Sequence, residues 1–255
     1  MAVLASGSSG NCTFIATERT KILIDAGLSG RETQRRLAGI GEKPESIQAI
    51  LITHEHWDHI AGLARLAGKY RIPVYITSLT RNALPNDIDL PALETIQAGR
   101  RFEISDLTVE PFTIPHDAAD PVAYRLKAEG AQVAVCTDLG YIPQNVKDSL
   151  RGTHCLVIES NHDLEMLRDG PYPWTIKQRI MSRTGHLSNT ALNKFLNSEE
   201  FDRQARVIVL AHLSQQNNHP EIAHLAASSA LESQNAGETR LVISSQLERT
   251  EVFEF

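Results

Sequence analysis

The chain has 255 residues, 42% of them hydrophobic and 22% charged, with a formal net charge of −6. These ordinary globular proportions predict one domain over residues 1–255 with a sizeable core, and no run approaches the ~18 apolar residues of a membrane span. The acidic balance argues against a protein that coats nucleic acid. It does not exclude a nuclease, because a metal site can hold phosphate locally while the remaining surface stays acidic.

Cysteine usage and the first residues both bear on the cellular compartment. Cys12, Cys136 and Cys155 lie far apart and form no CxxC pair, which favours reduced thiols over a disulfide framework. The opening MAVLASGSSGN lacks the charged start and the long apolar core of a signal peptide. We therefore expect a cytoplasmic protein that does not bind membranes, and its oligomeric state stays open.

Short apolar runs rich in β-branched residues predict buried strands. AVLA (2–5) and CTFIA (12–16) flank the turn SGSSGN and predict a hairpin. Each of the following runs is succeeded by a metal- or acid-type residue, which predicts that many strands deliver polar side chains to one edge of a sheet pair. The runs and the residues that follow them are KILI and Asp25, AILIT and His54, VEPFTIP and His116, QVAVCT and Asp138, CLVI and Glu159, and RVIVLA and His212.

Helical spacing of apolar residues occurs between these runs. Ser188 is a plausible N-cap for one stretch, and Pro220 stands in the first turn of another. Because strands and helices alternate along the chain, the predicted fold class is α/β or mixed α+β. The four predicted helices are RETQRRLAGI (31–40), HIAGLARLAGKY (59–70), SNTALNKFL (188–196) and HPEIAHLAASSALES (219–233).

The stretch HEHWDH crowds four metal-type side chains into six positions. His54 and His56 stand two residues apart at the end of a predicted strand, so they point to the same side and can reach one metal. Asp58 and His59 follow as the chain turns into a helix, where they can serve a second metal. A loop with chance histidines is the alternative, but the strand-ending partners elsewhere make it the weaker interpretation.

This HxHxDH pattern resembles that of the metallo-β-lactamase superfamily, and the resemblance extends over most of the chain. It implies a four-layered αβ/βα sandwich with a dinuclear metal site between two sheets. It also implies that Asp138 bridges the two metals and that Asp25 braces the site from behind. The implied ligands are His54, His56 and His116 for one metal, and Asp58, His59 and His212 for the other.

The chemistry of these side chains agrees with that assignment. Two metals ~3.5–4 Å apart can share a hydroxide and polarise a phosphoryl or carbonyl oxygen. Asp58 can accept the proton of the bridging water. His186 competes with His212 for the last ligand position, and His212 is preferred because it ends a strand-like run. The histidines suit Zn²⁺, and the carboxylates also suit Mn²⁺ or iron.

Further stretches resemble the YycJ/WalJ-type branch of that superfamily. Members of this branch look like 5′-to-3′ exonucleases acting on DNA, and they are similar to ribonuclease Z and to the cyclic phosphodiesterase PhnP. The resemblance therefore implies a metal-dependent phosphodiesterase, most specifically a DNA exonuclease that attacks with a metal-bridging hydroxide, with DNA repair as its expected setting. The stretches are LASGSSGNCTFI, LITHEHWDHIAGL, IPHDAADPVAY, CTDLGYI, ESNHD, GHLSN and AHLSQQNNHPE.

Candidate substrate-binding residues lie in two stretches. Residues 171–190 contain Lys177, Arg179 and Arg183 but no acid, just before His186 and a helix start that could bind an anion. We expect His186, Ser188 and Asn189 to contact phosphate, with His186 also a candidate to protonate the leaving oxygen. A solvated basic helix face is the alternative. In ESNHD, Asn161 and His162 are substrate-binding candidates, with a strand-ending turn as the alternative.

Two other functions remain open from the sequence alone. One is a small-molecule hydrolase of the same fold, a cyclic phosphodiesterase or a thioesterase, which the acidic charge favours. The other is a non-catalytic partner in a repair or signalling complex. Trp57 and Trp174 could stack on a base, but packing in the core or at its rim is the preferred interpretation for both.

Overall fold

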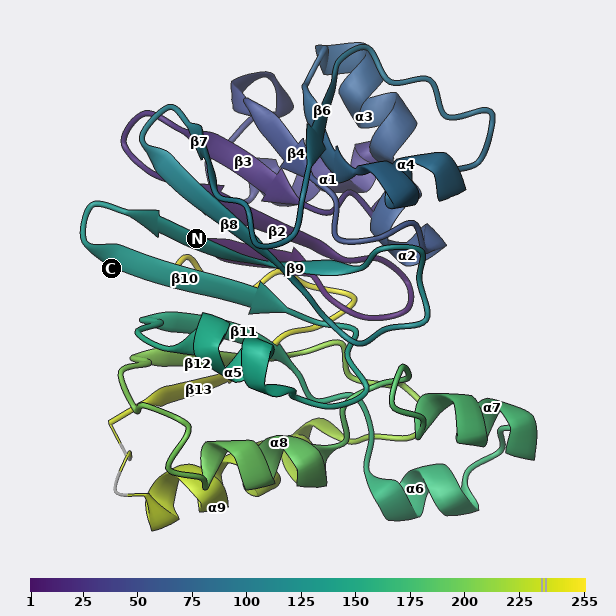
Figure 1. The fold of residues 1–255 in the computed structure, drawn as a ribbon, viewed down its shortest axis with the longest axis vertical. Coiled ribbons are helices and arrows are strands. Elements are labelled where there is room, and N and C mark those ends of the chain that lie inside the picture. Colours follow the sequence, from purple (N-terminus) through teal and green to yellow (C-terminus); the bar gives the residue numbers. More distant parts are fainter. Residues whose placement is uncertain (235, 237) are drawn as a thin grey trace.

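Two β-sheets face each other in the centre of the computed structural model, which describes residues 1–234, 236 and 238–255 (Figure 1). The first sheet has the order β1 (Ala2–Ala5), β2 (Cys12–Ala16), β3 (Lys21–Ile24), β4 (Ala49–Leu51), β5 (Val74–Thr77), β6 (Leu93–Ile96). The second has the order β13 (Arg240–Ile243), β12 (Val207–Ala211), β11 (Cys155–Glu159), β10 (Ala131–Cys136), β9 (Val122–Ala128), β8 (Leu107–Thr113), β7 (Phe102–Ile104).

Helices cover the outer face of each sheet, so the chain forms four layers. Near the first sheet lie α1 (Gly30–Ala38), the 3₁₀ turn η1 (Pro44–Ser46), α2 (Trp57–Ile60), α3 (Leu63–Tyr70) and α4 (Ser78–Ala83). Near the second lie α5 (Gln144–Leu150), α6 (Leu164–Asp169), α7 (Trp174–Ile180), α8 (Asn189–Leu196) and α9 (Pro220–Ser233). The predicted mixed α/β class and the four-layered sandwich are confirmed.

Three apolar clusters hold these layers together. One packs α1 and α3 on the first sheet, and another packs α5, α8 and α9 on the second. The third lies between the sheets and joins residues such as Ile22 and Ile24 to Val109 and Tyr124. That residues 1–255 form a single domain stays a prediction, which this shared core supports. Among the described residues, no helix is both long and apolar enough to cross a membrane.

The predicted strands and helices occur within a few residues of their expected bounds, with one difference. The helix expected over 59–70 is divided into α2 and α3. At the break, Gly62 N–H donates to the carbonyl of Ala26 at 2.8 Å and not to that of Asp58, and a Cβ on Gly62 would lie 1.9 Å from the carbonyl oxygen of Leu28. The break lets the chain turn just after the HEHWDH motif, so that α3 packs on the sheet while α2 stays at its edge.

The polar residues after the strands lie at one edge of the sandwich, near α2 in Figure 1. Strands β3 to β6 run parallel to one another, as do β10 to β13, so within each set the carboxyl ends share an edge. Asp25, Asp138 and His212 follow their strands with φ of 62°, 61° and 55°. Non-glycine residues rarely adopt this left-handed region, and such strain concentrates at functional sites.

Candidate metal centre

Seven predicted metal ligands from both sheets meet at this edge. Together with Glu159 and His186, they form groups whose side-chain nitrogen and oxygen atoms all lie within 4.8 Å of one another. The groups overlap, so they form one continuous cluster. They are His54, His56 and His116; Asp58, His59 and His212; His54, His59 and Asp138; and Asp138, Glu159, His186 and His212.

The first group has the spacing of ligands around one cation. His54 Nε2 lies 3.1 Å from His56 Nδ1, and His116 Nε2 lies 3.2 Å from the same atom. Nitrogens bound tetrahedrally to one Zn²⁺ at ~2.0–2.1 Å stand roughly 3.3 Å apart. His54 is fully buried, and burial, followed by the charge of His59, lowers its pKa well below the usual value. A neutral imidazole is the form that binds a metal.

The second group is joined to the first through Asp138. Asp58 Oδ2 lies 3.5 Å from His59 Nε2 and 3.4 Å from His212 Nε2. Asp138 Oδ2 lies 3.3 Å from His59 Nε2, and its Oδ1 lies 3.4 Å from His212 Nε2. Because Asp138 is also grouped with His54, its carboxylate stands between the two sets of ligands.

In the neutral ring of His59, one nitrogen is a hydrogen-bond acceptor that faces two carboxylates. Its Nδ1 donates to Asp25 Oδ2 at 2.7 Å, so the Nε2 of a neutral ring carries a lone pair that faces Asp58 and Asp138. Burial alone would lower the pKa of His59, but Asp25, Asp138 and Asp58 raise it well above the usual value. The site therefore requires positive charge here, from a proton or from a bound cation.

His212 repeats this arrangement on the second sheet. Its Nδ1 lies 3.1 Å from Glu159 Oε1, and its Nε2 faces Asp58 and Asp138. Burial again acts to lower the pKa of His212, and Asp138, Asp58 and Glu159 raise it well above the usual value. Asp138 Oδ2 is buried yet forms no hydrogen bond within the described residues. Mixed nitrogen and carboxylate donors clustered around this unpartnered oxygen fit two divalent cations.

Glu159 is not free to bind a metal, although it lies in one of the groups. It is fully buried, and Oε2 accepts from the backbone N–H of Leu139 at 2.9 Å and of Leu187 at 3.1 Å. Oε1 accepts from His186 Nδ1 at 2.8 Å and from His212 Nδ1 at 3.1 Å. Glu159 therefore orients both imidazoles, as carboxylates behind metal-binding histidines commonly do.

Asp25 lies behind His59, in the position that the resemblance implies. Thr53 and Asn11, which are not among the site residues predicted from the sequence, also contact residues of the cluster. Thr53 donates its backbone N–H to Asp25 at 2.9 Å, and its hydroxyl lies 3.0 Å from His54 Nδ1. Asn11 donates its amide to Asp58 Oδ2 at 3.1 Å and lies 3.0 Å from His59 Nε2. Asn11 ends the SGSSGN turn, which was the one available signal for it.

The sequence of this chain matches that of a known protein family. Residues 20–213 match the sequence profile of the family described as "Beta-lactamase superfamily domain". The chain belongs to the beta-lactamase superfamily. It is 40% identical over 238 residues to exodeoxyribonuclease YycJ of Bacillus anthracis, which covers 92% of this chain and 90% of that protein.

A second relative and one solved structure are also similar to this superfamily member. Exodeoxyribonuclease WalJ of Streptococcus pneumoniae (strain D39) is 39% identical over 228 residues, covering 88% of this chain and 84% of that protein. The crystal structure of the metallo-beta-lactamase fold protein YhfI from Bacillus subtilis superposes with a TM-score of 0.73. That superposition covers 98% of both chains at 15% identity and therefore supports the shared fold alone.

In this superfamily member, the three basic residues of the stretch 171–190 differ in exposure and in their partners. Lys177 is buried and its Nζ donates to the carbonyl of Arg168 at 2.6 Å, so the expectation that it binds substrate is wrong for this structure. Arg179 is exposed and pairs with Asp117, the residue after His116. Arg183 is exposed with its guanidinium 4.3 Å from the centre of the Tyr141 ring. Both arginines lie beside loops that carry predicted ligands.

Four other substrate-binding candidates are buried. Asn161 donates to the carbonyl of His212 at 2.8 Å, and the amide of Asn189 is used by Ser160 and Asn218. Ser188 caps α8 by accepting from Ala191 N. Burial lowers the pKa of His162 to about 4, so its ring is neutral. The structure does not bring these side chains to the surface, and the polar atoms of Asn161, Ser188 and Asn189 have partners within the protein.

The two tryptophans are not core residues, which excludes one of the two placements expected for them, while packing at the rim of the core stays a prediction. Trp57 is 67% exposed and Trp174 is 61% exposed. Trp57 stands between His56 and Asp58 at the start of α2, so its ring is available beside the metal centre.

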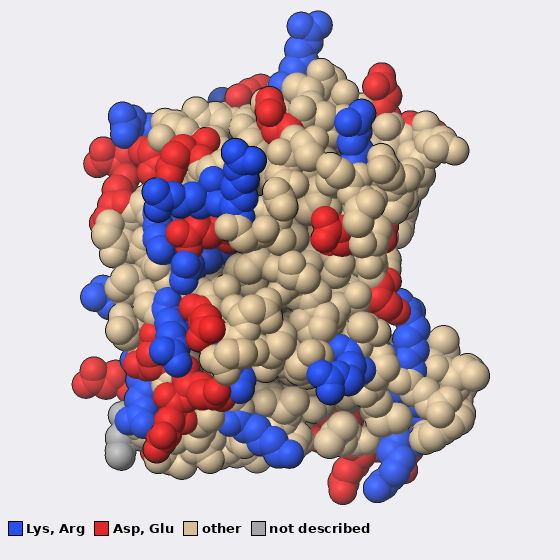
Figure 2. Space-filling model, in the orientation of Figure 1, with Lys and Arg blue, Asp and Glu red and all other residues tan. Residues whose placement is uncertain are grey.

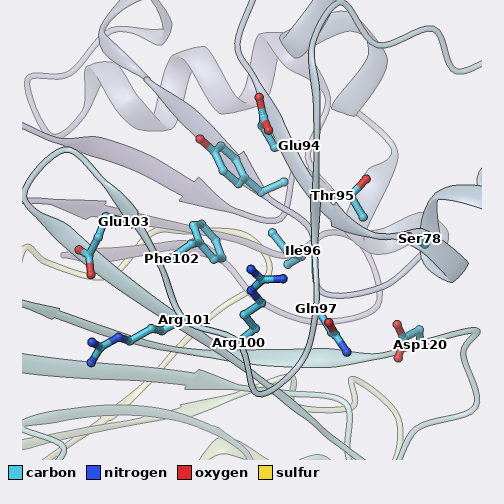
Figure 3. A pocket seen from close by; sticks show the side chains of 11 residues that line it. Ser78, Glu94, Thr95, Ile96, Gln97, Arg100, Arg101, Phe102, Glu103 and Asp120 are labelled. Carbon is cyan, nitrogen blue, oxygen red and sulfur yellow. The ribbon is translucent and has the colours of Figure 1, made fainter.

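A cavity of about 700 Å³ lies elsewhere, between β6 and β7, where Arg100 points inward and Arg101 points away (Figure 3). None of the clustered metal-type side chains lines it.

Replacing Gly27 with alanine is expected to lower the free energy of unfolding by about 3 kcal/mol or more. A Cβ there would lie 1.6 Å from the carbonyl oxygen of Asp58 and 2.6 Å from Asn11 N, so the metal-binding loop must move. Denaturant unfolding measures the effect. Gly68→Ala is the matched control, because no atom lies within 4 Å of a Cβ at that position in α3. Equal stability of the two variants would contradict the packing described here.

Removing divalent metal with a chelator is expected to lower Tm by about 5–10 °C. The unpaired acceptors around Asp138 stabilise the fold only when a cation or protons lie among them. A ligand at 100 times its Kd stabilises by ~2.7 kcal/mol, and each kcal/mol shifts Tm by ~2–4 °C at this size. Differential scanning fluorimetry with and without EDTA gives the result. An unchanged Tm would mean that the cluster holds no cation in solution.

Proposed function

We propose that this chain is a dinuclear metal-dependent phosphodiesterase that degrades DNA from its 5′ end. The observation that carries the proposal is the pair of imidazoles, His59 and His212, whose free nitrogens face the carboxylates of Asp58 and Asp138. The names of the two exodeoxyribonucleases support DNA as the substrate. Zn²⁺ or Mn²⁺ suits this donor set, and iron fits as well. A cytoplasmic location and a role in DNA repair belong to the same proposal.

The seven ligands would divide between two cations. His54, His56 and His116 would hold one, and Asp58, His59 and His212 would hold the other, with Asp138 shared. When bound, such ions acidify water and stabilise the negative charge that develops on a phosphate in the transition state. The rigid positions set by Asp25 and Glu159 would keep the ligands in place before substrate arrives.

Two side chains of the cluster can exchange protons with the substrate. The Asp58 side chain is 21% exposed, whereas those of Asp138 and Glu159 are 2% and 0% exposed. Asp58 is thus the carboxylate that can take a proton from the attacking water. His186 is 20% exposed and has its Nδ1 held by Glu159, which leaves Nε2 free to protonate the leaving oxygen.

Replacing His186 with alanine is therefore expected to lower turnover about 100-fold while metal content stays unchanged. The reason is that His186 donates a proton but is not among the seven ligands. Metal content by plasma mass spectrometry and turnover on DNA give the two readouts. Unchanged turnover would remove His186 from the mechanism, and loss of metal would make it a ligand.

End-labelled, 5′-phosphorylated double-stranded DNA with Mn²⁺ tests the proposed function directly. We expect successive loss of nucleotides from the 5′ end, absent in Asp58→Ala. Cleavage of RNA alone, or of a small chromogenic diester alone, would overturn DNA as the substrate. No cleavage of any ester by the metal-loaded protein would overturn the hydrolase.

A further inference from the structure

A second concentration of positive charge lies outside the metal centre, in a pocket of about 250 Å³ between α1 and α3. Its charged lining residues are Arg31, Arg65 and Lys69, and neither aspartate nor glutamate lines it. All three side chains belong to exposed residues. In a chain with a net charge of −6, a pocket with cations alone departs from the general balance.

The charges of this pocket are not neutralised from within. Among the described residues, no carboxylate oxygen lies within 4.0 Å of the charged nitrogens of Arg31, Arg65 or Lys69. By contrast, Arg35 and Arg36 of the same α1 both pair with Glu32 at 2.6 Å. Figure 2 likewise shows both signs interleaved over the strands β7 to β10. Lys69 Nζ donates only to the neutral hydroxyl of Tyr70, at 2.9 Å.

Both helices that line the pocket begin shortly after loops that carry residues of the metal centre. α1 follows the loop that begins with Asp25, and α3 follows α2, which carries Asp58 and His59. The two loops are joined by hydrogen bonds from Ala26 N to the carbonyl of His59 and from Gly62 N to that of Ala26, each 2.8 Å. Arg65 lies in the first turn of α3, seven residues after Asp58 and beyond the turn at Gly62 that separates α2 from α3.

We propose that the α1–α3 pocket binds a backbone phosphate of the DNA strand whose end lies at the metal centre. The inference rests on the proposed function and adds a second contact for its polymeric substrate. Arginine and lysine neutralise phosphate and release its counterions, which makes such binding dependent on salt. The pocket thus gives a net-acidic protein a local means of holding nucleic acid.

The test compares two triple variants with the same change in charge. One is Arg31→Gln with Arg65→Gln and Lys69→Gln. The control changes Lys43, Lys194 and Arg206 to Gln. These residues are exposed, and among the described residues they too form no ion pair. The metal-loaded proteins bind fluorescent DNA whose ends carry cleavage-resistant phosphorothioates, and anisotropy is followed as salt is raised. Only the pocket variant should lose affinity, about tenfold or more, with a salt slope shallower by about one or more.

The result separates the pocket from the proposed function. Equal affinity and slope in the wild type and the pocket variant, or an equal loss in the control, would overturn the inference. Arg65→Gln alone, which removes one exposed side chain, repeats the test if the triple variant has a lowered Tm. Turnover of bis-p-nitrophenyl phosphate should stay unchanged in all variants. Failure of the wild type to degrade unprotected DNA would sink the function, while the binding data would still decide the pocket.

Discussion

Asp138→Asn is expected to reduce DNA degradation by about a thousandfold or more. Asp138 is the carboxylate shared by the two ligand groups, and its buried Oδ2 has no hydrogen-bond partner among the described residues. Asparagine keeps the volume but removes the negative charge that holds two dications close together. Plasma mass spectrometry should therefore show a loss of bound metal alongside the loss of turnover.

The Asp138→Asn chain should nevertheless fold, because its shape is preserved and the position keeps a residue that tolerates φ of 61°. Its Tm should respond much less to EDTA than that of the wild type. His224→Asn is the matched control, since His224 is exposed on α9 and outside the cluster. Two bound metals and wild-type turnover in Asp138→Asn would contradict a bridging role.

Glu159→Gln is expected to lower metal affinity and turnover by about 10- to 100-fold each. Each carboxylate oxygen of Glu159 accepts from two donors, so an amide group in either orientation leaves two donors facing a third. The buried mismatch should also lower the free energy of unfolding by about 3 kcal/mol. Metal titration, steady-state kinetics and denaturant unfolding measure the three effects.

The matched control for this substitution is Glu165→Gln, because Glu165 is exposed on α6 and holds no histidine. It should leave metal affinity, turnover and stability unchanged. Wild-type metal affinity in Glu159→Gln would show that His212 does not need its carboxylate partner. In that case the orientation of the imidazole would come from packing alone.

The sequence allowed prediction of the metal centre because its signals are local. A short β-branched run followed by Asp25, His54 or His212 marks both a buried strand and a side chain at its end. When several such strands lie parallel, their ends must meet, so three-dimensional proximity follows from one-dimensional pattern. The four layers follow from the same alternation of strands and helices.

The remaining site residues could not be predicted because their roles depend on contacts distant in sequence. Lys177 reads as a free cation until the carbonyl of Arg168 takes up its ammonium group. Glu159 reads in the sequence only as an acid at the end of a strand, and the fold shows that His186 and His212 converge on it. Asn11 reaches Asp58 across a separation of 47 residues. Local pattern contains none of these pairings.

The measurement that tests the dinuclear nuclease most directly is a metal titration of chelated protein with DNA degradation as the readout. We expect little turnover without metal, and a rise that ends at two equivalents of Zn²⁺ or Mn²⁺ per chain. Asp58→Ala should stay inactive throughout. Full turnover at one equivalent or in the absence of metal, or none at two, would contradict a two-metal centre that hydrolyses DNA.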